Sequence, residues 1–202
     1  MTSFSDLILS TAHAQAPAGA PPQPSPFMSL APMGLIAAAE SYNPLGTNDA
    51  DGRRVGVDLL ERVLSGYPEH AECARIAFMV GGVWLNAGDT AKAVAGFERF
   101  IRLFPGNDRA AEARYTIAQA WLRAANFDSA RAEWARFLGE YPSSGLWRNA
   151  QAAIEDSWVA QARAAFDRND AAAGVAAYTR YLRDYPVGRH APSIEYDLAQ
   201  RR

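Results

Sequence analysis

Four stretches of the chain carry apolar residues at the spacing of an amphipathic helix, and each ends at an aromatic residue followed by proline. In one of them, Phe97, Phe100, Ile101 and Phe104 recur at i, i+3, i+4 and i+7, which places them on one helical face. Proline stops such a helix because the residue before it is pushed out of the α region. The four aromatic-proline pairs are Tyr67-Pro68, Phe104-Pro105, Tyr141-Pro142 and Tyr185-Pro186, at intervals of 37, 37 and 44 residues.

Further helical stretches lie between these four. The predicted ranges are Glu72–Asn86, Arg109–Ala124 and about Leu146–Arg168. We expect Gly88, Asn126 and Asn169 to take the left-handed conformation that closes a helix, with a following Asp capping the next helix. Each unit is then helix, tight turn, helix, proline, and this fixed period is typical of an α-solenoid. The 44-residue interval predicts a lengthened first helix around Trp147–Arg168.

The first 39 residues differ from the rest in composition. They hold one charged side chain, Asp6, and half of the twelve prolines. Residues 14–26 are rich in proline, which cannot continue a helix, so we expect an extended or disordered linker there. The small-x-small pattern Ala12-His13-Ala14 resembles a signal-peptidase site, although no Lys or Arg precedes it. A cleaved export signal and the disordered tail of a cytosolic protein both remain open.

The most apolar stretch of the chain is residues 27–39. It is interrupted by Pro32 and falls short of the roughly 20 residues that span a bilayer. It predicts a short helix, about Met33–Tyr42, that packs on the rest of the fold. The predicted organisation is a signal-like, Pro/Ala-rich tail over residues 1–26, a short apolar helix and linker over residues 27–52, and a helical repeat domain over residues 53–202.

Composition agrees with an all-α protein. Alanine, the strongest helix former, is the commonest residue. The formal net charge of −2 disfavours a sequence-independent nucleic-acid binder, which needs a basic surface. The single cysteine, Cys73, excludes an intramolecular disulfide framework and a Cys-based zinc site.

Small residues recur at one register when positions are counted back from each proline. In one unit Gly81 and Ala93 precede Phe97. In the next unit Ala118 and Ala130 occupy the equivalent positions before Trp134. This pattern resembles the tetratricopeptide repeat. With its period of 37 and its aromatic-proline endings, it resembles in particular the repeats of bacterial envelope proteins, such as outer-membrane assembly lipoproteins and the Tol-Pal-associated periplasmic protein. The predicted structural positions are Gly81, Ala93, Phe97, Ala118, Ala130, Trp134, Pro68, Pro105, Pro142 and Pro186.

The resemblance implies an α-solenoid of about four antiparallel helix pairs, in which small side chains allow two helices to approach to about 8–10 Å. Replacing Ala93 or Ala130 with leucine should overpack that crossing and cost about 1–3 kcal/mol. Thermal unfolding of the two variants measures this cost. An unchanged unfolding temperature in either variant would contradict the proposed repeat register.

Function is expected to lie in surface recognition, because the first helices of such repeats line a concave face. The resemblance implies a non-enzymatic scaffold or adaptor that binds a protein or peptide segment, in the periplasm or cell envelope, with the cytoplasm as the alternative location. The other role left open is an accessory subunit of a membrane-associated complex, docked through the N-terminal apolar segment. The groove positions carried over from the family are Arg75, Phe78, Asn86, Glu112, Tyr115, Gln119, Arg123, Asp156 and Arg163.

No set of residues predicts catalysis. His13, His70 and His190 lack a second metal ligand at helical spacing. Glu155 and Asp156 are adjacent on a helix and point about 100° apart, so a solvated charged face is expected rather than a carboxylate pair. The five tryptophans are expected to lie mostly in the core. We therefore expect no catalytic residue, metal, cofactor or small-molecule substrate.

Overall fold

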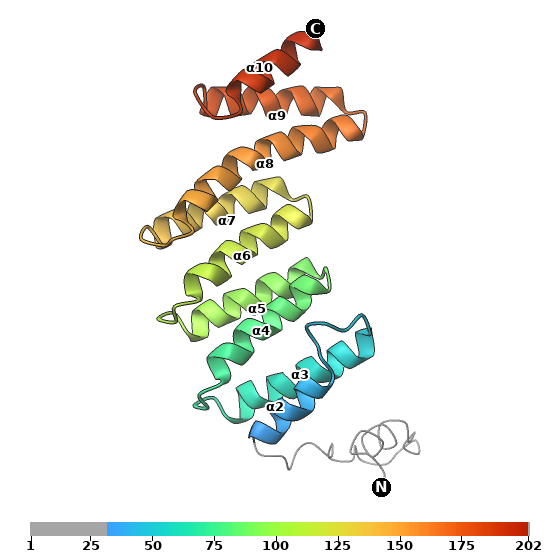
Figure 1. Ribbon diagram of the computed structural model, residues 1–202, viewed down its shortest axis with the longest axis vertical. Coiled ribbons are helices and arrows are strands. Elements are labelled where there is room, and N and C mark those ends of the chain that lie inside the picture. Colours follow the sequence, from blue (N-terminus) through green and yellow to red (C-terminus); the bar gives the residue numbers. More distant parts are fainter. Residues whose placement is uncertain (1–31, 202) are drawn as a thin grey trace.

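The computed structural model describes residues 32–201. Within this range the regular elements are all helices, joined by turns (Figure 1). They are α2 (Pro32–Ser41), α3 (Ala50–Gly66), α4 (Cys73–Asn86), α5 (Thr90–Leu103), α6 (Ala110–Arg123), α7 (Phe127–Glu140), α8 (Trp147–Asp167), α9 (Ala171–Asp184) and α10 (Ala191–Gln200).

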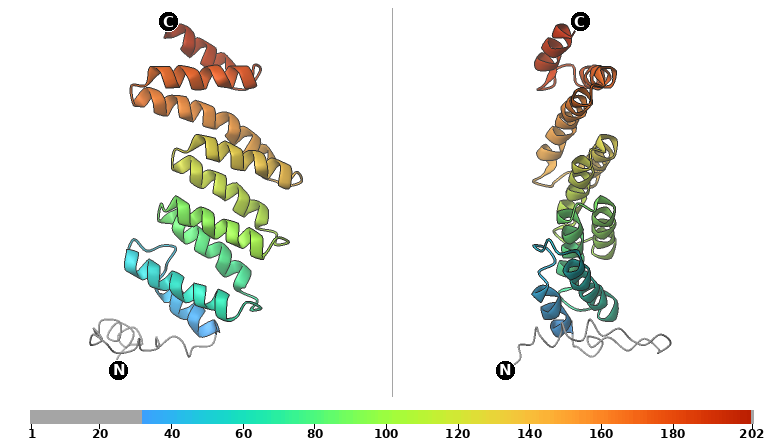
Figure 2. Two further views of the ribbon diagram at one scale, coloured as in Figure 1. Left: turned by 180° about the vertical axis from the view of Figure 1, so that it is seen from behind. Right: turned by 90° about the vertical axis from the view of Figure 1, so that its right-hand side faces the viewer.

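The helices form a stack of antiparallel pairs. Each packs against its neighbours in the chain, in the order α2–α3, α4–α5, α6–α7 and α8–α9, with α10 following α9. From behind, α3 and α5 lie in front of α2 and α4, so the first and second helices of a pair occupy different sides of the stack (Figure 2). The predicted all-α solenoid of about four pairs is confirmed. The sequence had predicted no helix corresponding to α10.

Helix α2 completes the first pair. The sequence predicted it as Met33–Tyr42, packed on the fold, and the structure has it as Pro32–Ser41 against α3. Leu35, Ile36, Ala38 and Ala39 of this helix are buried. The described part of the apolar N-terminal stretch is therefore a structural member of the stack.

The longer third interval is explained by α8. This helix has 21 residues, whereas the equivalent first helices α4 and α6 have 14 each, a difference of 21 − 14 = 7 residues. That difference equals the growth of the interval from 37 to 44 residues. The predicted lengthening of the first helix around Trp147–Arg168 is confirmed.

The turns within the α4–α5, α6–α7 and α8–α9 pairs each use one left-handed residue followed by a capping side chain. Gly88, Ala125 and Asn169 have φ of 76°, 56° and 60°. The prediction for the middle turn was wrong by one position. Ala125, not Asn126, takes the left-handed conformation, and the Asn126 side chain instead caps α7 by accepting from the Ser129 N–H at 3.2 Å.

Ala125 therefore holds a conformation that costs an L-residue about 1–2 kcal/mol. Ala125→Gly should raise the free energy of unfolding by about 1 kcal/mol, because glycine adopts this conformation without the Cβ clash. The neighbouring Ala124→Gly is the control and should destabilise, since Ala124 has φ of −79°. Urea denaturation measures both, and a loss of stability in Ala125→Gly would refute the turn geometry.

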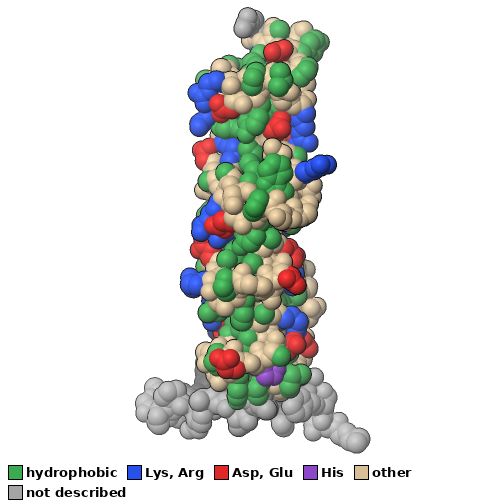
Figure 3. Space-filling model, turned by 90° about the vertical axis from the view of Figure 1, so that its left-hand side faces the viewer, with side chains coloured by type: hydrophobic (Ala, Val, Ile, Leu, Met, Phe, Trp, Pro, Cys, Tyr) green, Lys and Arg blue, Asp and Glu red, His purple; other side chains and the backbone are tan. Residues whose placement is uncertain are grey.

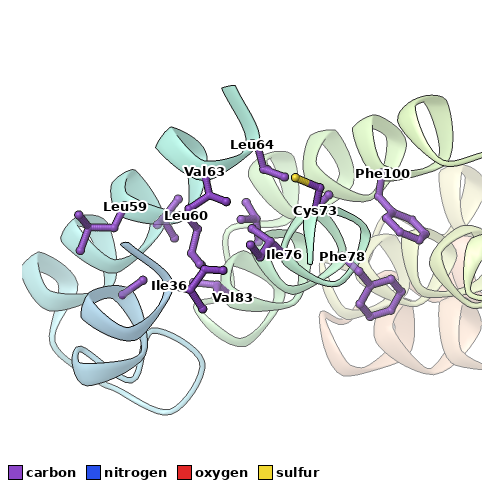
Figure 4. Close-up of a cluster of buried hydrophobic side chains, with 14 of the residues drawn as sticks. Ile36, Leu59, Leu60, Val63, Leu64, Cys73, Ile76, Phe78, Val83 and Phe100 are labelled. Carbon is purple, nitrogen blue, oxygen red and sulfur yellow. The ribbon is translucent and has the colours of Figure 1, made fainter. Parts of the chain in front are cut away.

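Apolar packing runs along the stack in three clusters of buried side chains. The first joins α2 to α6 (Figure 4), the second centres on Trp134, and the third on Trp158 and Tyr181. Contacts are thus made mainly between neighbouring helices, as in a solenoid. Destabilising one crossing is expected to act first on the adjoining helices.

Helices α4 and α5 approach each other closely. A Cβ built on Gly96 would lie 2.9 Å from the Gly81 Cα, and one built on Gly81 would lie 2.8 Å from the Phe97 ring. Ala93 and Phe97 are buried at the same crossing. Gly81, Ala93 and Phe97 thus lie where the register placed them, as do the buried Ala118, Ala130 and Trp134 of the next pair. The sequence analysis missed Gly96.

The aromatic-proline endings close the second helices. Phe104, Tyr141 and Tyr185 each pack on an aromatic ring four residues earlier, with ring centroids 5.9, 5.7 and 5.3 Å apart. Their backbone N–H groups donate to the carbonyls of those same earlier residues. The prolines that follow, Pro68, Pro105, Pro142 and Pro186, are exposed.

Candidate functional site

A cleft lies between the first helices α6 and α8, with the second helix α7 behind it. Its volume is about 170 Å³, close to the roughly 150 Å³ of a cavity that holds one benzene ring. The cleft therefore has room for one side chain or ring. Its lining residues are Tyr115, Gln119, Leu122, Trp134, Ala153, Asp156, Ser157 and Ala160.

Tyr115, Gln119 and Asp156 are the predicted groove residues that meet in this cleft. Tyr115 packs its ring on Trp134 and Phe137, with centroids 6.3 and 5.7 Å apart. Burial raises the pKa of Tyr115, and a hydrogen bond with Gln119 partly opposes the rise. The Tyr115 phenol is therefore un-ionised at neutral pH and can both donate and accept a hydrogen bond.

Trp134 lines the cleft and carries an enclosed indole donor that is unpaired among the described residues. Its side chain is only 1% exposed, and its indole Nε1–H has no hydrogen-bond partner among the described residues. A buried polar group without a partner costs about 1–3 kcal/mol. The Nε1 atom has almost no accessible area, so a ligand in the cleft would meet the ring of Trp134 and not this donor.

Asp156 is already engaged by the turn before α10. Arg189 Nη2 lies 2.5 Å from one carboxylate oxygen and His190 Nε2 lies 2.6 Å from the other. Glu155 accepts a hydrogen bond from the Tyr181 hydroxyl at 2.8 Å, and burial is the main cause that raises the pKa of Tyr181 to about 12. Asp156 is exposed, as expected for a charged face, and both carboxylates in addition tie α8 to the α9–α10 turn.

Phe78, the predicted groove residue 37 positions before Tyr115, is placed differently. It is only 9% exposed and packs edge-on against Phe97 and Phe100. The Arg109 guanidinium lies 3.4 Å from the centre of its ring. The prediction that Phe78 offers an exposed aromatic anchor is corrected: it is a core residue, and Arg109 covers it.

The remaining predicted groove residues lie outside the cleft and are exposed. Arg75 pairs with Glu72 and Glu40. Asn86 donates to the Leu45 carbonyl at 3.2 Å, and Glu112 pairs with Arg109. Arg123 and Arg163 are exposed on α6 and α8. The structure thus gathers only part of the predicted groove into one site.

A comparison with models of protein families finds the tetratricopeptide repeat at residues 77–107 and again at residues 112–144. Residues 77–144 are therefore tetratricopeptide repeats. The matches run from within α4 to the turn after α7, so Tyr115 and Trp134 belong to the second. No curated protein matches the chain. The predicted resemblance is confirmed for the repeat, while the envelope subtype stays a prediction.

Tetratricopeptide repeats generally bind protein partners, and typically bind rather than catalyse. The surface here agrees with a binding role that is not purely electrostatic. On the face in Figure 3, side chains of both charges are interspersed with apolar and uncharged areas along the stack. No single-sign field therefore covers this face.

Two buried arginines hold the repeats around the cleft. Arg131 of α7 stacks on Trp158 at 3.4 Å and donates to Ser157, a cleft residue, at 3.2 Å. Arg114 of α6 pairs with Glu140 at 3.1 Å. Burial lowers the pKa of Arg131. The sequence analysis missed both residues, because an arginine on an amphipathic helix ordinarily indicates a solvated position.

A second cleft, of about 230 Å³, involves the helices α3, α4 and α5. Lys92 lies 4.2 Å over the Trp84 ring, and Arg99 forms an ion pair with Glu61. The charged groups that line this cleft are thus already partnered within the repeats.

Residues 32–201 contain no group of three or more His, Cys, Asp or Glu side chains placed to hold a metal ion. Cys73 is buried, its thiol donates to the Tyr67 carbonyl at 3.1 Å, and burial raises its pKa. A raised pKa keeps this thiol protonated and weakly nucleophilic. Across this part of the chain, no helix combines the length and apolar character that crossing a membrane requires.

Proposed function

We propose that the chain is a non-enzymatic scaffold or adaptor that anchors a segment of a partner protein in the α6–α8 cleft. The observation that carries the proposal is the open, ring-sized space that Tyr115, Gln119 and the Trp134 ring line between the two helices. Interface anchors are typically aromatic and sit in such well-packed pockets. The position of this cleft within tetratricopeptide repeats, which generally bind proteins, supports the same role.

The proposed location is the periplasm or cell envelope of a bacterium. Support comes from the sequence alone, through the 37-residue period, the aromatic-proline endings and the export-like pattern at Ala12-His13-Ala14. Mass spectrometry of the N-terminus of protein purified from its own cell tests it. A mature protein starting near Gln15 is expected, and an intact Met1 or Thr2 would remove the export interpretation.

The alternative role is an accessory subunit docked through the N-terminal apolar segment. The burial of Leu35, Ile36, Ala38 and Ala39 favours the cleft instead, because α2 would have to leave the stack to dock elsewhere. A test of this alternative must spare α2, so residues 1–31 are the segment to delete. Loss of partner association on that deletion would favour the accessory-subunit role, and retention would exclude residues 1–31 as the docking segment.

Filling the cleft is expected to abolish partner capture. Ala160 lines the cleft on α8 and is partly exposed, so Ala160→Arg places a long charged side chain there without entering the core. We expect at least a tenfold fall in the partner recovered by affinity purification, measured by quantitative mass spectrometry. Ala132→Arg, the same change at an exposed position of α7, is the matched control and should capture normally. Equal capture by both variants would place binding elsewhere.

A further inference from the structure

An arginine recurs six residues before the proline that follows each of the second helices α3, α5, α7 and α9. In the middle of the stack these arginines have carboxylate partners. Arg99 of α5 forms an ion pair with Glu61 of α3. A hydrogen bond with Glu140 is the main cause that raises the pKa of Arg136 on α7, and Glu98 of α5 adds to the rise. Glu61 and Glu98 both lie seven residues before a proline, so a carboxylate of one second helix serves the arginine of the next.

Arg180 of α9 has no such carboxylate. The equivalent position on the preceding second helix is Ala135. Asp184, one turn later on α9, pairs with Arg183 at 2.9 Å. That hydrogen bond is the main cause that lowers the pKa of Asp184, and the charge of Arg180 adds a smaller part. In the described part of the chain, no carboxylate lies within ion-pair distance of the Arg180 guanidinium and no acceptor takes a hydrogen bond from it.

Arg180 instead lies over an indole ring that a second arginine already covers. Its guanidinium carbon is 5.0 Å from the centre of the Trp158 ring, and the guanidinium carbon of Arg131 is 3.4 Å from the same centre. Burial is the main cause that lowers the pKa of Arg131, and the charge of Arg180 lowers it further. The two cations therefore repel each other at this ring, and an anion beside them would relieve that repulsion.

The available donors at this ring belong to Arg180. The buried Arg131 pairs with Asp128 and donates to Ser157 at 3.2 Å and Gln161 at 2.8 Å, so its N–H groups are engaged. Arg180 is exposed. A guanidinium held against an aromatic face keeps a planar fork of N–H donors, and this fork matches the two oxygens of a carboxylate. The arrangement at this ring is thus suited to a carboxylate that approaches from outside the chain.

We propose that Arg180, with Trp158 and Arg131 behind it, binds a carboxylate of an acidic segment in a partner protein. Charge complementarity identifies the occupant, because two guanidinium groups share one carboxylate, Asp128, and the equivalent arginines of α5 and α7 are met by glutamates. The formal net charge of −2 disfavours nucleic acid as the source of the anion. None of the three residues lines the α6–α8 cleft, so this is a second contact, beyond the proposed function.

Titration of the full chain with a blocked Gly-Glu-Glu-Gly peptide tests the site. Nuclear magnetic resonance follows the Nε–H signals of the arginines and the indole N–H signals of the tryptophans. We expect saturable shifts at Arg180 and Trp158, and binding that weakens as added salt screens the charges. The peptide with glutamine in place of glutamate should bind at least tenfold more weakly. Equal binding of the two peptides, or similar shifts at every exposed arginine, would overturn the proposal.

Arg180→Gln should lower the affinity for the acidic peptide at least tenfold. Arg136→Gln is the matched control, because it makes the same change of charge at the same register of α7, where the arginine is paired with Glu140. Its affinity should stay within about twofold of the unchanged chain. Both arginines are exposed, so both variants should fold, and thermal unfolding checks this. Equal losses in the two variants, or no loss in Arg180→Gln, would refute the site.

Two further measurements assign the anion and separate this site from the cleft. Inorganic phosphate should bind at Arg180 more weakly than the acidic peptide, and tighter binding of phosphate would overturn the carboxylate assignment. Ala160→Arg should bind the peptide normally, and loss of binding would place the peptide in the α6–α8 cleft instead. If Arg180→Gln loses the peptide while Ala160→Arg captures the protein partner normally, this inference stands and the proposed function fails. If Ala160→Arg abolishes capture while Arg180→Gln keeps the peptide, the proposed function stands and this inference fails.

Discussion

Trp134→Ala should lower the free energy of unfolding by about 3–5 kcal/mol, the usual cost of emptying a large aromatic position in a core. The side chain is 1% exposed and packs among residues of α6, α7 and α8. Its loss would leave a cavity at the junction of two repeats. Urea denaturation followed by circular dichroism measures the change.

Two further variants make this prediction specific. Trp147→Ala should cost clearly less, because Trp147 is only half-buried and its Nε1–H donates to the Leu138 carbonyl at 3.3 Å near the edge of the stack. Trp134→Phe should also cost less, since it removes a buried donor that has no partner. A Trp134→Ala variant as stable as Trp147→Ala would contradict the central packing role of Trp134.

Gly96→Val should lower the free energy of unfolding by about 3 kcal/mol, the upper part of the range for overpacking. The new Cβ would lie 2.9 Å from the Gly81 Cα and 3.1 Å from the Gly81 nitrogen. These are backbone atoms of α4, so relief requires the two helices to separate rather than one side chain to turn. The loss of contact would spread to Phe97, which packs on Gly81.

Gly139→Val provides the matched control for Gly96→Val. Gly139 also lies in a second helix, α7, but a Cβ there would meet no atom within 4 Å. Valine has a slightly better helix propensity than glycine, so stability should stay the same or rise by a few tenths of a kcal/mol. If the two substitutions had similar effects, helix propensity rather than the close α4–α5 approach would explain glycine at position 96.

Equivalent positions in successive repeats have different surroundings, and only one of them lines the α6–α8 cleft. Phe78 and Tyr115 are 37 residues apart and occupy the same register, yet Arg109 covers the first and the second faces an open cleft. Position 146, which is 37 residues after Arg109, is Leu146 and has no guanidinium to stack on Tyr115.

The sequence by itself determined the architecture. The aromatic-proline pairs, the 37-residue period and the capping residues predicted the helix pairs and the longer α8, because helix starts, stops and apolar faces depend on nearby residues. In a solenoid each unit contacts only its neighbours, so a correct repeat pattern already implies the stacking. The prediction of the left-handed residue in the α6–α7 turn was wrong by one position, Asn126 instead of Ala125. The error is local and does not change the helix pairs.

Only the tertiary structure decided which side chains are available to a partner. The cover of Phe78 comes from Arg109 on the other side of a helix pair, and the partners of Asp156 come from a turn more than 30 residues away. The burial of Arg114 and Arg131 likewise depends on carboxylates and a tryptophan of other helices. The exposure of a side chain depends on residues from several helices. Periodicity along one helix carries no information about those other residues.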